Sequence, residues 1–518
     1  MKRFPLLTVL LVAAMLLSSV AAVAAPAPAV SQTAPQSPAL DVSSAPPVQE
    51  APPDKEASQA DCALLDDPAA RDMMSGMFET KLLNLCGRTN ELGRVASSTP
   101  ERAPQVGVDV LVNDPAPEVN ASSRTQSETS IALNENTGTI CSGYNDSYSG
   151  VVQGLGYTGF SNSTDGGATF VDRGALGAAS FGDPSVFWRR ADGLFYLGTI
   201  HSSGMGLWRS NDDCETMTFV GTPHVGSGDD KELFAVDNFP GSPYYGRIYM
   251  AWTNFNVGGG TIQAIYSDDA STWSSPVNLS NAGTDVQGAW PYVAPNGDVY
   301  VAWVRWNPYP SGNIDVEIVK STNGGVSWSF VTNPMSNQVN PRAAAPTASC
   351  GRPALNGNIR YLPSPQIAVT PNGDLHVVYS YDPDGYNTGD VVNVYYRRST
   401  DGGATWGPEF QLNDDATTND QWFPSLSAGP TGRVVAAWYD RRADANNFDF
   451  TYWMRVSDDG GTTWAPSFQV SDVPSGVVLD PNLATCYHGD YDQQVQDASS
   501  GYIQWSDDRT VQSTDPNV

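Results

Sequence analysis

From about residue 107 to the C-terminus, hydrophobic positions come in short runs of β-branched and aromatic residues. Gly, Asn and Asp separate these runs, as in Val299-Tyr-Val-Ala-Trp303 and Val434-Val-Ala-Ala-Trp438. Runs of this length, bounded by turn residues, are typical of β-strands and too short for helices. The pattern therefore predicts an all-β domain over residues 107–518.

One turn sequence recurs between these runs. Complete copies read Ser-Thr-Asp-Gly-Gly-Ala-Thr, or a close variant, followed by Trp or Phe. The copies start at residues 163, 210, 267, 321, 399 and 457, and those at 210 and 267 are degenerate. Self-similarity at this spacing predicts a propeller or another repeat array.

The turn sequence has a mechanical explanation. Ser and Asp side chains accept hydrogen bonds from backbone N–H groups across a tight turn, and the Gly-Gly pair supplies positive φ angles. The aromatic residue then packs beneath the turn. These residues are expected to close hairpins and to take no part in chemistry. Their carboxylates could also hold structural calcium, but the turn geometry explains them without it.

Seven pairs of strands accompany the six turns, and the last pair spans residues 490–505. We interpret each repeat as a blade of four antiparallel strands, which predicts seven blades. The segment Val108–Asp114 resembles the strand that follows a turn, as in Phe410-Gln-Leu-Asn-Asp414. We therefore expect it to complete the last blade and to close the ring.

The first hundred residues differ from the rest. Lys2-Arg3, an apolar run from Leu6 to Leu17 and Ala22-Val-Ala24 predict a cleaved signal peptide over residues 1–25. Residues 26–60 are rich in Ala and Pro and predict a flexible linker. Residues 61–95 predict a short helical segment, because Asp67 can cap a helix with Pro68 in its first turn.

Composition and charge exclude several functions. The 518 residues include 27 Lys and Arg against 56 Asp and Glu, for a formal net charge of −29. Binding nucleic acid requires clustered Lys and Arg, and so does docking on anionic membranes. We expect neither partner. No later apolar run is long enough to span a bilayer, so we expect a secreted protein without membrane insertion, and a monomer.

The repeated Ser-x-Asp-x-Gly-x-x-Trp turns resemble the Asp-box, or bacterial neuraminidase repeat, of propellers such as the sialidase superfamily. The resemblance covers residues 107–518, about four fifths of the chain. It implies a β-propeller, and the usual number of blades in sialidases gives six as the alternative to seven. It implies an activity less strongly, because Asp boxes also occur in propellers with other enzymatic roles and in receptors.

Strand direction predicts where a site would lie. In a four-stranded blade, the segments before the first strand and after the second converge on one face of the ring, near its axis. Those segments are polar in this chain, and Arg, Tyr, Trp and paired carboxylates suit the recognition of sugars and carboxylates. The residues expected to line that face are Asp183, Asp230, Arg305, Asp440, Arg441, Asp490, Tyr491 and Arg509.

The resemblance implies roles for these residues. A sialidase site needs three arginines that clamp the substrate carboxylate, a Tyr activated by a Glu, and an Asp acid/base. Arg305, Arg441 and Arg509 could form the clamp, together with Asp440 and Asp490 as further substrate-binding residues. Tyr491 with Glu128 could form the nucleophile pair, and Asp183 or Asp230 could be the acid. The Arg-Ile-Pro motif typical of an early sialidase strand is absent.

Three functions fit these residues. The first is a secreted sialidase-like glycosidase acting on sialic-acid-type or other acidic glycans, without a cofactor or catalytic metal. The second is an extracellular propeller that binds glycans or glycoproteins without catalysis. The third is a polysaccharide lyase that uses a Tyr or His base, for which His201 and His488 are candidates.

Six cysteines are expected to form disulfides in an oxidising compartment. Cys62 and Cys86 bracket the helical segment. Cys141 and Cys214 lie toward the face of the repeated turns, whereas Cys350 and Cys486 lie toward the opposite face. We therefore expect the pairs Cys62–Cys86, Cys141–Cys214 and Cys350–Cys486.

Overall fold

The computed structural model describes residues 59–92, 109–118, 121–309, 312–338, 353–383 and 392–508. All of them belong to one compact unit, Val48–Val518. The expected signal sequence and most of the expected linker lie outside these residues, as do Cys350 and Arg509.

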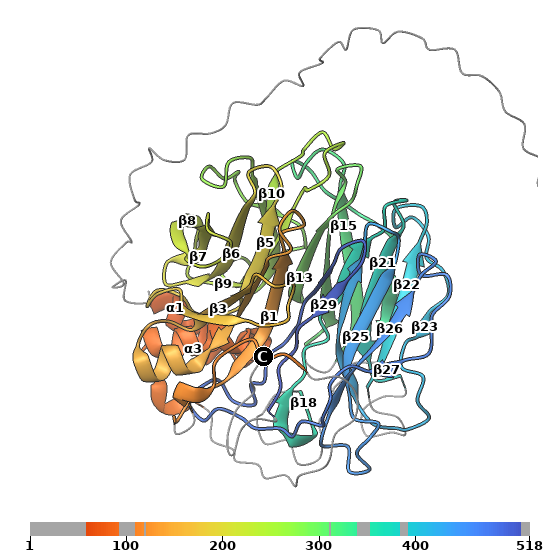
Figure 1. Ribbon diagram of the computed structural model, residues 1–518. Helices are drawn as coiled ribbons and strands as arrows, with labels where there is room; N and C mark the ends of the chain where they lie inside the picture. Colours follow the sequence, from red (N-terminus) through yellow and green to blue (C-terminus); the bar gives the residue numbers. More distant parts are fainter. Residues whose placement is uncertain are drawn as a thin grey trace, which may run out of the picture. The chain divides into compact units, whose positions relative to one another are not determined.

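The fold is an all-β propeller with six blades of four antiparallel strands and few helices (Figure 1). Blade one contains β1 (Gln126–Leu133), β2 (Ile140–Asp146), β3 (Thr158–Ser163) and β4 (Val171–Ala175). Blade two contains β5 (Ser185–Arg189), β6 (Leu194–His201), β7 (Gly204–Ser210) and β8 (Thr218–Val225). Blade three contains β9 (Asp229–Val236), β10 (Ile248–Asn254), β11 (Thr261–Ser267) and β12 (Val277–Asn278).

The remaining blades follow the same order along the chain. Blade four contains β13 (Asp285–Val293), β14 (Val299–Asn307), β15 (Asn313–Ser321) and β16 (Ser329–Phe330), and β17 (Met335–Gln338) also pairs with β15. Blade five contains β20 (Gln366–Val369), β21 (Leu375–Tyr381), β22 (Asn393–Ser399) and β23 (Phe410–Gln411). Blade six contains β24 (Gln421–Ala428), β25 (Val434–Asp440), β26 (Thr451–Ser457) and β27 (Phe468–Gln469).

The seventh strand pair does not become a full blade. β28 (Gln494–Gln496) and β29 (Gly501–Ile503) form a two-stranded sheet, and β28 contacts β24 on one side and β1 on the other. The expectation of seven four-stranded blades is therefore corrected to six, the alternative. The reason is that no third strand pairs with β29 within the described part of the chain.

The expected closing strand is also corrected. Residues 109–112 form no strand. Instead, the Asp472 N–H donates to Asp109 Oδ2 at 2.9 Å, and the Asp114 N–H donates to Asp172 Oδ2 at 2.9 Å. The segment thus bridges the outer parts of blades six and one through side chains rather than through a strand ladder.

The repeated turns have the expected hydrogen bonds. In the copy at 399, Ser399 Oγ accepts from the Gly403 N–H at 2.8 Å, and Asp401 accepts from the Thr405 N–H at 2.9 Å. Gly403 has a φ of 91°, which favours glycine. The Ser Oγ bond to the residue four positions on recurs at Gly167, Cys214, Gly325 and Gly461.

These bonds give a prediction about stability. Ser399→Ala should lower the free energy of unfolding by about 1 kcal/mol, because the buried Gly403 N–H loses its acceptor. Ser329→Ala, at an exposed position in β16, should leave it within about 0.5 kcal/mol of the parent. Denaturant titrations of the two variants test this, and equal losses would contradict the role given to the turn.

Helices gather in the N-terminal part of the described chain. They are α1 (Gln59–Ala63), α2 (Pro68–Met73) and α3 (Gly76–Leu85), and short helical turns lie at Leu64–Asp66, Thr89–Glu91, Ala116–Glu118, Tyr148–Gln153 and Asn356–Asn358. The Asp67 side chain accepts from the Ala69 and Ala70 N–H groups, so the predicted cap of α2 is confirmed. Two small strands, β18 (Ala354–Leu355) and β19 (Ile359–Arg360), precede blade five.

Two of the three expected disulfides are present. They join Cys62 to Cys86 and Cys141 to Cys214. Cys486 is also disulfide-bonded, whereas its expected partner, Cys350, lies outside the described residues. Disulfides of this kind persist in oxidising compartments.

Candidate functional site

Charged residues at or just before the innermost strand of three neighbouring blades come together in the interior. Glu128, Asp183 and Lys231 have positive φ angles of 52°, 55° and 56°. Such angles are uncommon outside glycine, and residues held in them are concentrated at functional sites. All three side chains are at most 1% exposed.

Lys231 and Arg360 hold the carboxylates of this cluster. Lys231 Nζ lies 3.0 Å from Asp490 Oδ2 and 3.5 Å from Glu128 Oε1. Arg360 Nη2, from β19, lies 3.1 Å from the same Asp490 oxygen. These residues form the axial cluster, which we define as Glu128, Asp183, Lys231, Arg360 and Asp490.

Among the residues that the structure describes, no donor forms a hydrogen bond with either carboxyl oxygen of Asp183. Asn145 connects it to Glu128 by accepting from the Asp183 N–H at 2.8 Å and donating to Glu128 Oε2 at 3.1 Å. Burial and the nearby Glu128 carboxylate raise the pKa of Asp183 well above its ordinary value. A proton on Asp183 therefore relieves the repulsion between two adjacent carboxylates.

Asp490 has the opposite shift. Burial acts to raise its pKa, but the positive charges of Arg360 and Lys231 outweigh burial, and the pKa falls below its ordinary value. The cluster thus contains two carboxyl groups whose pKa values are shifted in opposite directions, that of Asp183 upward and that of Asp490 downward. Pairs of this kind are how enzymes assign acid and base roles to identical side chains.

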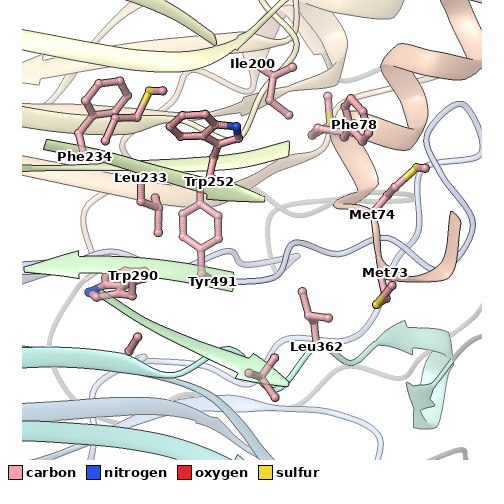
Figure 2. Packing of buried hydrophobic residues seen from close by; sticks show 14 of the residues in the cluster. Met73, Met74, Phe78, Ile200, Leu233, Phe234, Trp252, Trp290, Leu362 and Tyr491 are labelled. Carbon is pink, nitrogen blue, oxygen red and sulfur yellow. The ribbon is translucent and has the colours of Figure 1, made fainter. Parts of the chain in front are cut away.

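Tyr491 lies beside the cluster but is part of the packed interior. Its hydroxyl donates to the Pro184 carbonyl at 3.0 Å, and Lys231 Nζ lies 4.7 Å from the centre of its ring. Figure 2 shows the Tyr491 ring between Trp252 and Trp290. Burial and the charge of Glu128 raise the pKa of Tyr491 well above its ordinary value, so the phenol is protonated at neutral pH.

Asp230 faces a different partner. Its Oδ2 accepts from the Ser75 N–H at 2.7 Å and from Gln287 Nε2 at 2.7 Å, and its Oδ1 accepts from Ser75 Oγ at 2.5 Å. Burial raises the pKa of Asp230 to about 6, although the Ser75 bonds oppose the shift. Asp230 therefore fastens residues 59–92 to blade three.

Three other sequence-predicted residues, all within the described ranges, do not join the cluster. Arg305 is directly opposite Asp315 across β14 and β15 and pairs with it and with Glu317. Arg441 is fully buried and pairs with Asp420 at 2.9 Å. Asp440 pairs with the neighbouring Arg442 at 2.7 Å. The structure thus assembles Glu128, Asp183, Asp490 and Tyr491, with Asp230 close by, and disperses these two arginines.

Four further residues belong to the cluster or contact it. Lys231 and Asn145 lie at strand ends that the topological argument places on this face, although neither was among the residues selected for the site. Arg360 and Tyr487 carry no comparable signal in the sequence. Asn145 Nδ2 donates to the Tyr487 hydroxyl, which brings residues from opposite ends of the domain together.

Residues 59–92, which we call the helical cap, cover the axial cluster. Met73, Met74 and Phe78 are at most 1% exposed and belong to one hydrophobic core with Trp252, Leu362 and Tyr491. Figure 2 shows Met74 and Phe78 on the cap, on the side that faces the propeller strands. Phe78 stacks on Phe255 with ring centres 6.0 Å apart. The cluster is therefore closed to solvent in this conformation.

The two candidate lyase bases lie in other surroundings. Burial lowers the pKa of His201 to about 4, so this ring is neutral at physiological pH. His488 Nε2 lies 3.2 Å from Asp508 Oδ2. Across the described ranges, no group of three or more His, Cys, Asp or Glu is arranged to hold a metal ion, and no helix is long and apolar enough to cross a membrane.

No protein-family model matches this sequence. A sialidase from Micromonospora viridifaciens is 41% identical over 54 residues, which are 10% of this chain and 8% of that protein.

Among solved structures, a Dyadobacter fermentans protein of unknown function has a TM-score of 0.42 at 14% identity, covering 79% of this chain and 95% of that one. A Hadza microbial sialidase has a TM-score of 0.36 at 15% identity over 72% of this chain and 61% of its own. The six-bladed lectin of Aleuria aurantia has a TM-score of 0.39 at 13% identity over 67% and 95%. None of these likenesses assigns an activity to this chain.

Proposed function

We propose that this protein is a secreted glycoside hydrolase that uses the axial cluster, with Asp183 as the proton donor and Asp490 as the ionised carboxylate. The observation that carries the proposal is the arrangement of the cluster, in which Asp490 contacts Lys231 at 3.0 Å and Arg360 at 3.1 Å, whereas Asp183 lies beside the Glu128 carboxylate. This arrangement shifts the pKa values of Asp183 and Asp490 in opposite directions. Glycoside hydrolysis needs such a pair, one carboxyl protonated and the other ionised. The proposed partner is therefore a glycan or glycoprotein.

Each residue of the axial cluster has a separate role in the proposed reaction. Asp183 gives its proton to the leaving oxygen as the glycosidic C–O bond breaks. A water molecule adds to the sugar carbon, and Asp490 takes the proton that this water loses. Glu128 raises the pKa of Asp183, while Arg360 and Lys231 keep Asp490 ionised.

Sialidase specificity is less well supported than hydrolysis. The clamp would need Arg305 and Arg441, and both are engaged by carboxylates of their own blades. Tyr491, the expected nucleophile, is protonated and donates to a backbone carbonyl. The site holds more carboxyl groups than cations: Glu128, Asp183, Asp490 and the nearby Asp230 stand against Lys231 and Arg360. We therefore propose neutral glycans rather than sialosides as substrates.

Substrate access requires movement of the helical cap, because Asp230 and the cluster lie beneath it. The cap is held by the Ser75 bonds to Asp230 and by apolar contacts. Its own disulfide, Cys62–Cys86, and the Arg71–Glu79 ion pair lie within it. These internal links let the cap separate from the blades as a unit, and we assign it the role of lid on the proposed site.

A hydrolysis assay tests the proposal. Fluorogenic α-arabinofuranoside, β-galactoside and α-sialoside are incubated with the full chain and with Gly76→Ala, a variant expected to loosen the cap. We expect one of the neutral glycosides to be cleaved faster by Gly76→Ala, and Asp183→Asn in that background to reduce kcat at least about a hundredfold. Asp192→Asn, outside the cluster, is the matched control and should retain full activity.

The pH profile follows from the same shifts. Activity needs a proton on Asp183, whose pKa is raised, and a charge on Asp490, whose pKa is lowered. The rate should therefore fall at low pH as Asp490 gains a proton and at high pH as Asp183 loses one. A cap-loosened protein that cleaves none of the three substrates, or that cleaves one equally well after the Asp183→Asn change, would contradict the proposal.

One observation favours a second candidate, a propeller that binds glycans without catalysis. A groove of about 800 Å³ lies between the repeated turns of blades five and six. Trp406, Phe410, Trp464 and Arg455 line it, and aromatic faces beside a cation suit sugar rings. Glycan-array binding that Trp406→Ala abolishes, without hydrolysis, would favour this candidate.

A further inference from the structure

The helical cap meets the propeller at a pair of buried polar side chains, Asp230 and Gln287. Asp230 Oδ1 accepts from Ser75 Oγ at 2.5 Å, and Asp230 Oδ2 accepts from the Ser75 N–H at 2.7 Å. Gln287 Nε2 donates to Asp230 Oδ2 at 2.7 Å and to the Met73 carbonyl at 2.9 Å. Asp230, Gln287 and Ser75 are each 0% exposed. The cap thus presents two donors and one acceptor to one pair of propeller side chains.

The propeller itself holds this pair in place. Asp230 lies in β9, directly opposite Thr253 of β10 in the antiparallel register. Gln287 lies in β13 of the next blade, and its Oε1 accepts from the Thr253 hydroxyl. Because Oε1 is occupied in this way, the Gln287 amide group is fixed as a donor toward Asp230 and the cap. The two side chains should therefore keep their orientation when the cap moves.

Two neighbouring sugar hydroxyls can make the same hydrogen bonds as the cap. In Ser75, the two donors are separated by two carbon atoms, Cα and Cβ, and the oxygens of a vicinal diol are also separated by two carbons. A hydroxyl donates once and accepts as well. One hydroxyl could therefore donate to Asp230 Oδ1, while its neighbour donates to Oδ2 and accepts from Gln287 Nε2.

The charge of Asp230 selects among sugars. Burial raises its pKa to about 6, so the carboxylate is ionised at neutral pH. Hydrogen bonds from hydroxyls to a charged carboxylate are stronger than bonds between neutral groups. A sugar carboxylate at the same place would instead be repelled. Asp230 and Gln287 therefore suit the hydroxyl groups of a neutral sugar.

Asp230 also lies close to the proposed proton donor. It precedes Lys231, a member of the axial cluster, in β9. Burial and the Glu128 carboxylate raise the pKa of Asp183 most, and Asp230 adds to this shift. Asp230 is therefore within electrostatic reach of Asp183. A sugar bound by Asp230 and Gln287 would lie beside the group that is assigned to break its glycosidic bond.

We propose that Asp230 and Gln287 form a sugar-binding subsite for a vicinal diol, and that Ser75 of the helical cap occupies this subsite in the closed conformation. The inference rests on the proposed function, which requires a sugar beside the axial cluster. Ser75 and a sugar cannot bond to Asp230 at the same time. The cap is therefore an internal competitor of the substrate, and binding of a sugar shifts the population toward the open conformation.

Sugar binding can be measured without catalysis, as faster amide exchange over residues 76–85 of the full chain. Methyl α-arabinofuranoside and methyl β-galactoside are the neutral probes, and methyl α-sialoside is the acidic one. We expect saturable acceleration with at least one neutral probe and none with the sialoside. Among the monodeoxy forms of the active probe, two should bind at least about tenfold more weakly, and the hydroxyls that these two lack should be adjacent.

Two variants separate sugar binding from attachment of the cap. Ser75→Ala and Asp230→Ala both remove hydrogen bonds between the cap and the propeller, so both should loosen the cap. Ser75→Ala leaves the subsite intact and should lower the half-saturating sugar concentration at least about fivefold, because more of the protein is open. Asp230→Ala removes the acceptors and should raise that concentration at least about tenfold.

Further variants guard against an indirect effect. Gln287→Ala should also weaken sugar binding, because the second hydroxyl loses its donor. Asp237→Ala, near the other end of blade three's innermost strand, is the matched control for Asp230→Ala. Asp237 is 0% exposed and accepts from the Ser242 hydroxyl and from the Phe239 N–H, so a similar set of bonds is lost. Its sugar binding should equal that of the parent.

Several outcomes would overturn the subsite. They are the absence of acceleration by both neutral probes, deoxy positions that are not adjacent, and tighter sugar binding in Asp230→Ala, as in Ser75→Ala, which would make Asp230 an anchor for the cap alone. The hydrolysis assay decides the proposed function separately. Sugar binding with the expected pattern but without cleavage would support the subsite and contradict hydrolysis. Cleavage of a neutral glycoside with a KM that Asp230→Ala leaves unchanged would do the reverse.

Discussion

Replacement of Gly76 by alanine is expected to displace the helical cap. A Cβ at this position would lie 2.0 Å from Tyr487 Cδ2, 2.3 Å from Cε2 and 2.6 Å from Cγ. Tyr487 is 1% exposed and accepts from Asn145, so its ring has no free space into which to move. The start of α3 must therefore shift away from the propeller.

The expected result is a loss of roughly 1–3 kcal/mol in the free energy of unfolding, the usual range for overpacking. Alanine is the better helix former by about 1 kcal/mol, so a loss would show that contact with Tyr487, and not helix propensity, decides the outcome. Amide exchange should accelerate over residues 76–85 and remain unchanged in β21 and β25.

Gly241→Ala is the matched control for this variant. A Cβ there meets nothing within 4 Å, so its stability and exchange should equal those of the parent. Parent-like stability and exchange in Gly76→Ala would contradict the close packing of the cap on Tyr487. The access route proposed for the axial cluster would then lose its support.

The propeller architecture could be predicted from the sequence because each of its turns is specified by residues that are close together in the chain. Each repeated turn is closed by bonds between residues two to four positions apart, such as Ser399 to Gly403. The pattern therefore marks every hairpin independently of the rest of the fold. The number of complete blades was not accessible in this way, since it depends on whether a strand pairs with β29, which is a long-range property.

The candidate site was accessible only in part. The topological argument brings Glu128, Asp183 and Asp490 to one end of the axis, because all three lie at the start of innermost strands. It fails for Arg305, which lies within the second strand of its blade, β14, because a charged side chain there can pair across the sheet. Arg305 has Asp315 directly opposite in the register, and a cross-strand ion pair holds it within its own blade.

The helical cap shows a further limit. The spacing of Met74, Met77 and Phe78 predicts an apolar face but does not identify the surface that the face covers. That surface is set by Ser75 and Asp230, residues 155 positions apart in the chain. Arg360 is similar, because it reaches Asp490 from a small hairpin whose sequence carries no repeat signal.

Lys231→Met is expected to destabilise the protein by about 3–5 kcal/mol, because it leaves buried carboxylates without their counter-charge. The ammonium contacts Asp490 at 3.0 Å and Glu128 at 3.5 Å, and all three side chains are at most 1% exposed. Methionine has a similar length and no charge, so the variant changes the electrostatics more than the packing.

The decrease in unfolding free energy that Lys231→Met causes should depend on pH. In the parent, Asp490 has a lowered pKa, so its pairing stabilises the fold above its ordinary pKa and is lost only as the pH falls through the lowered value. Lys231→Met removes the ion pair between Lys231 and Asp490, and protonation of the carboxylates in the cluster relieves the repulsion that remains among them. The difference in unfolding free energy from the parent should therefore be larger at pH 8 than at pH 5.

Lys320→Met is the control for charge removal. Lys320 pairs with Asp298 at 2.6 Å, but its side chain is 23% exposed, so water can replace the lost partner. Lys320→Met should lower the free energy of unfolding by at most about 1 kcal/mol, and this decrease should be nearly independent of pH. Denaturant titrations of the three proteins at both pH values decide the matter. Equal losses in the two variants, or a loss in Lys231→Met that does not vary with pH, would mean that the axial carboxylates do not depend on Lys231.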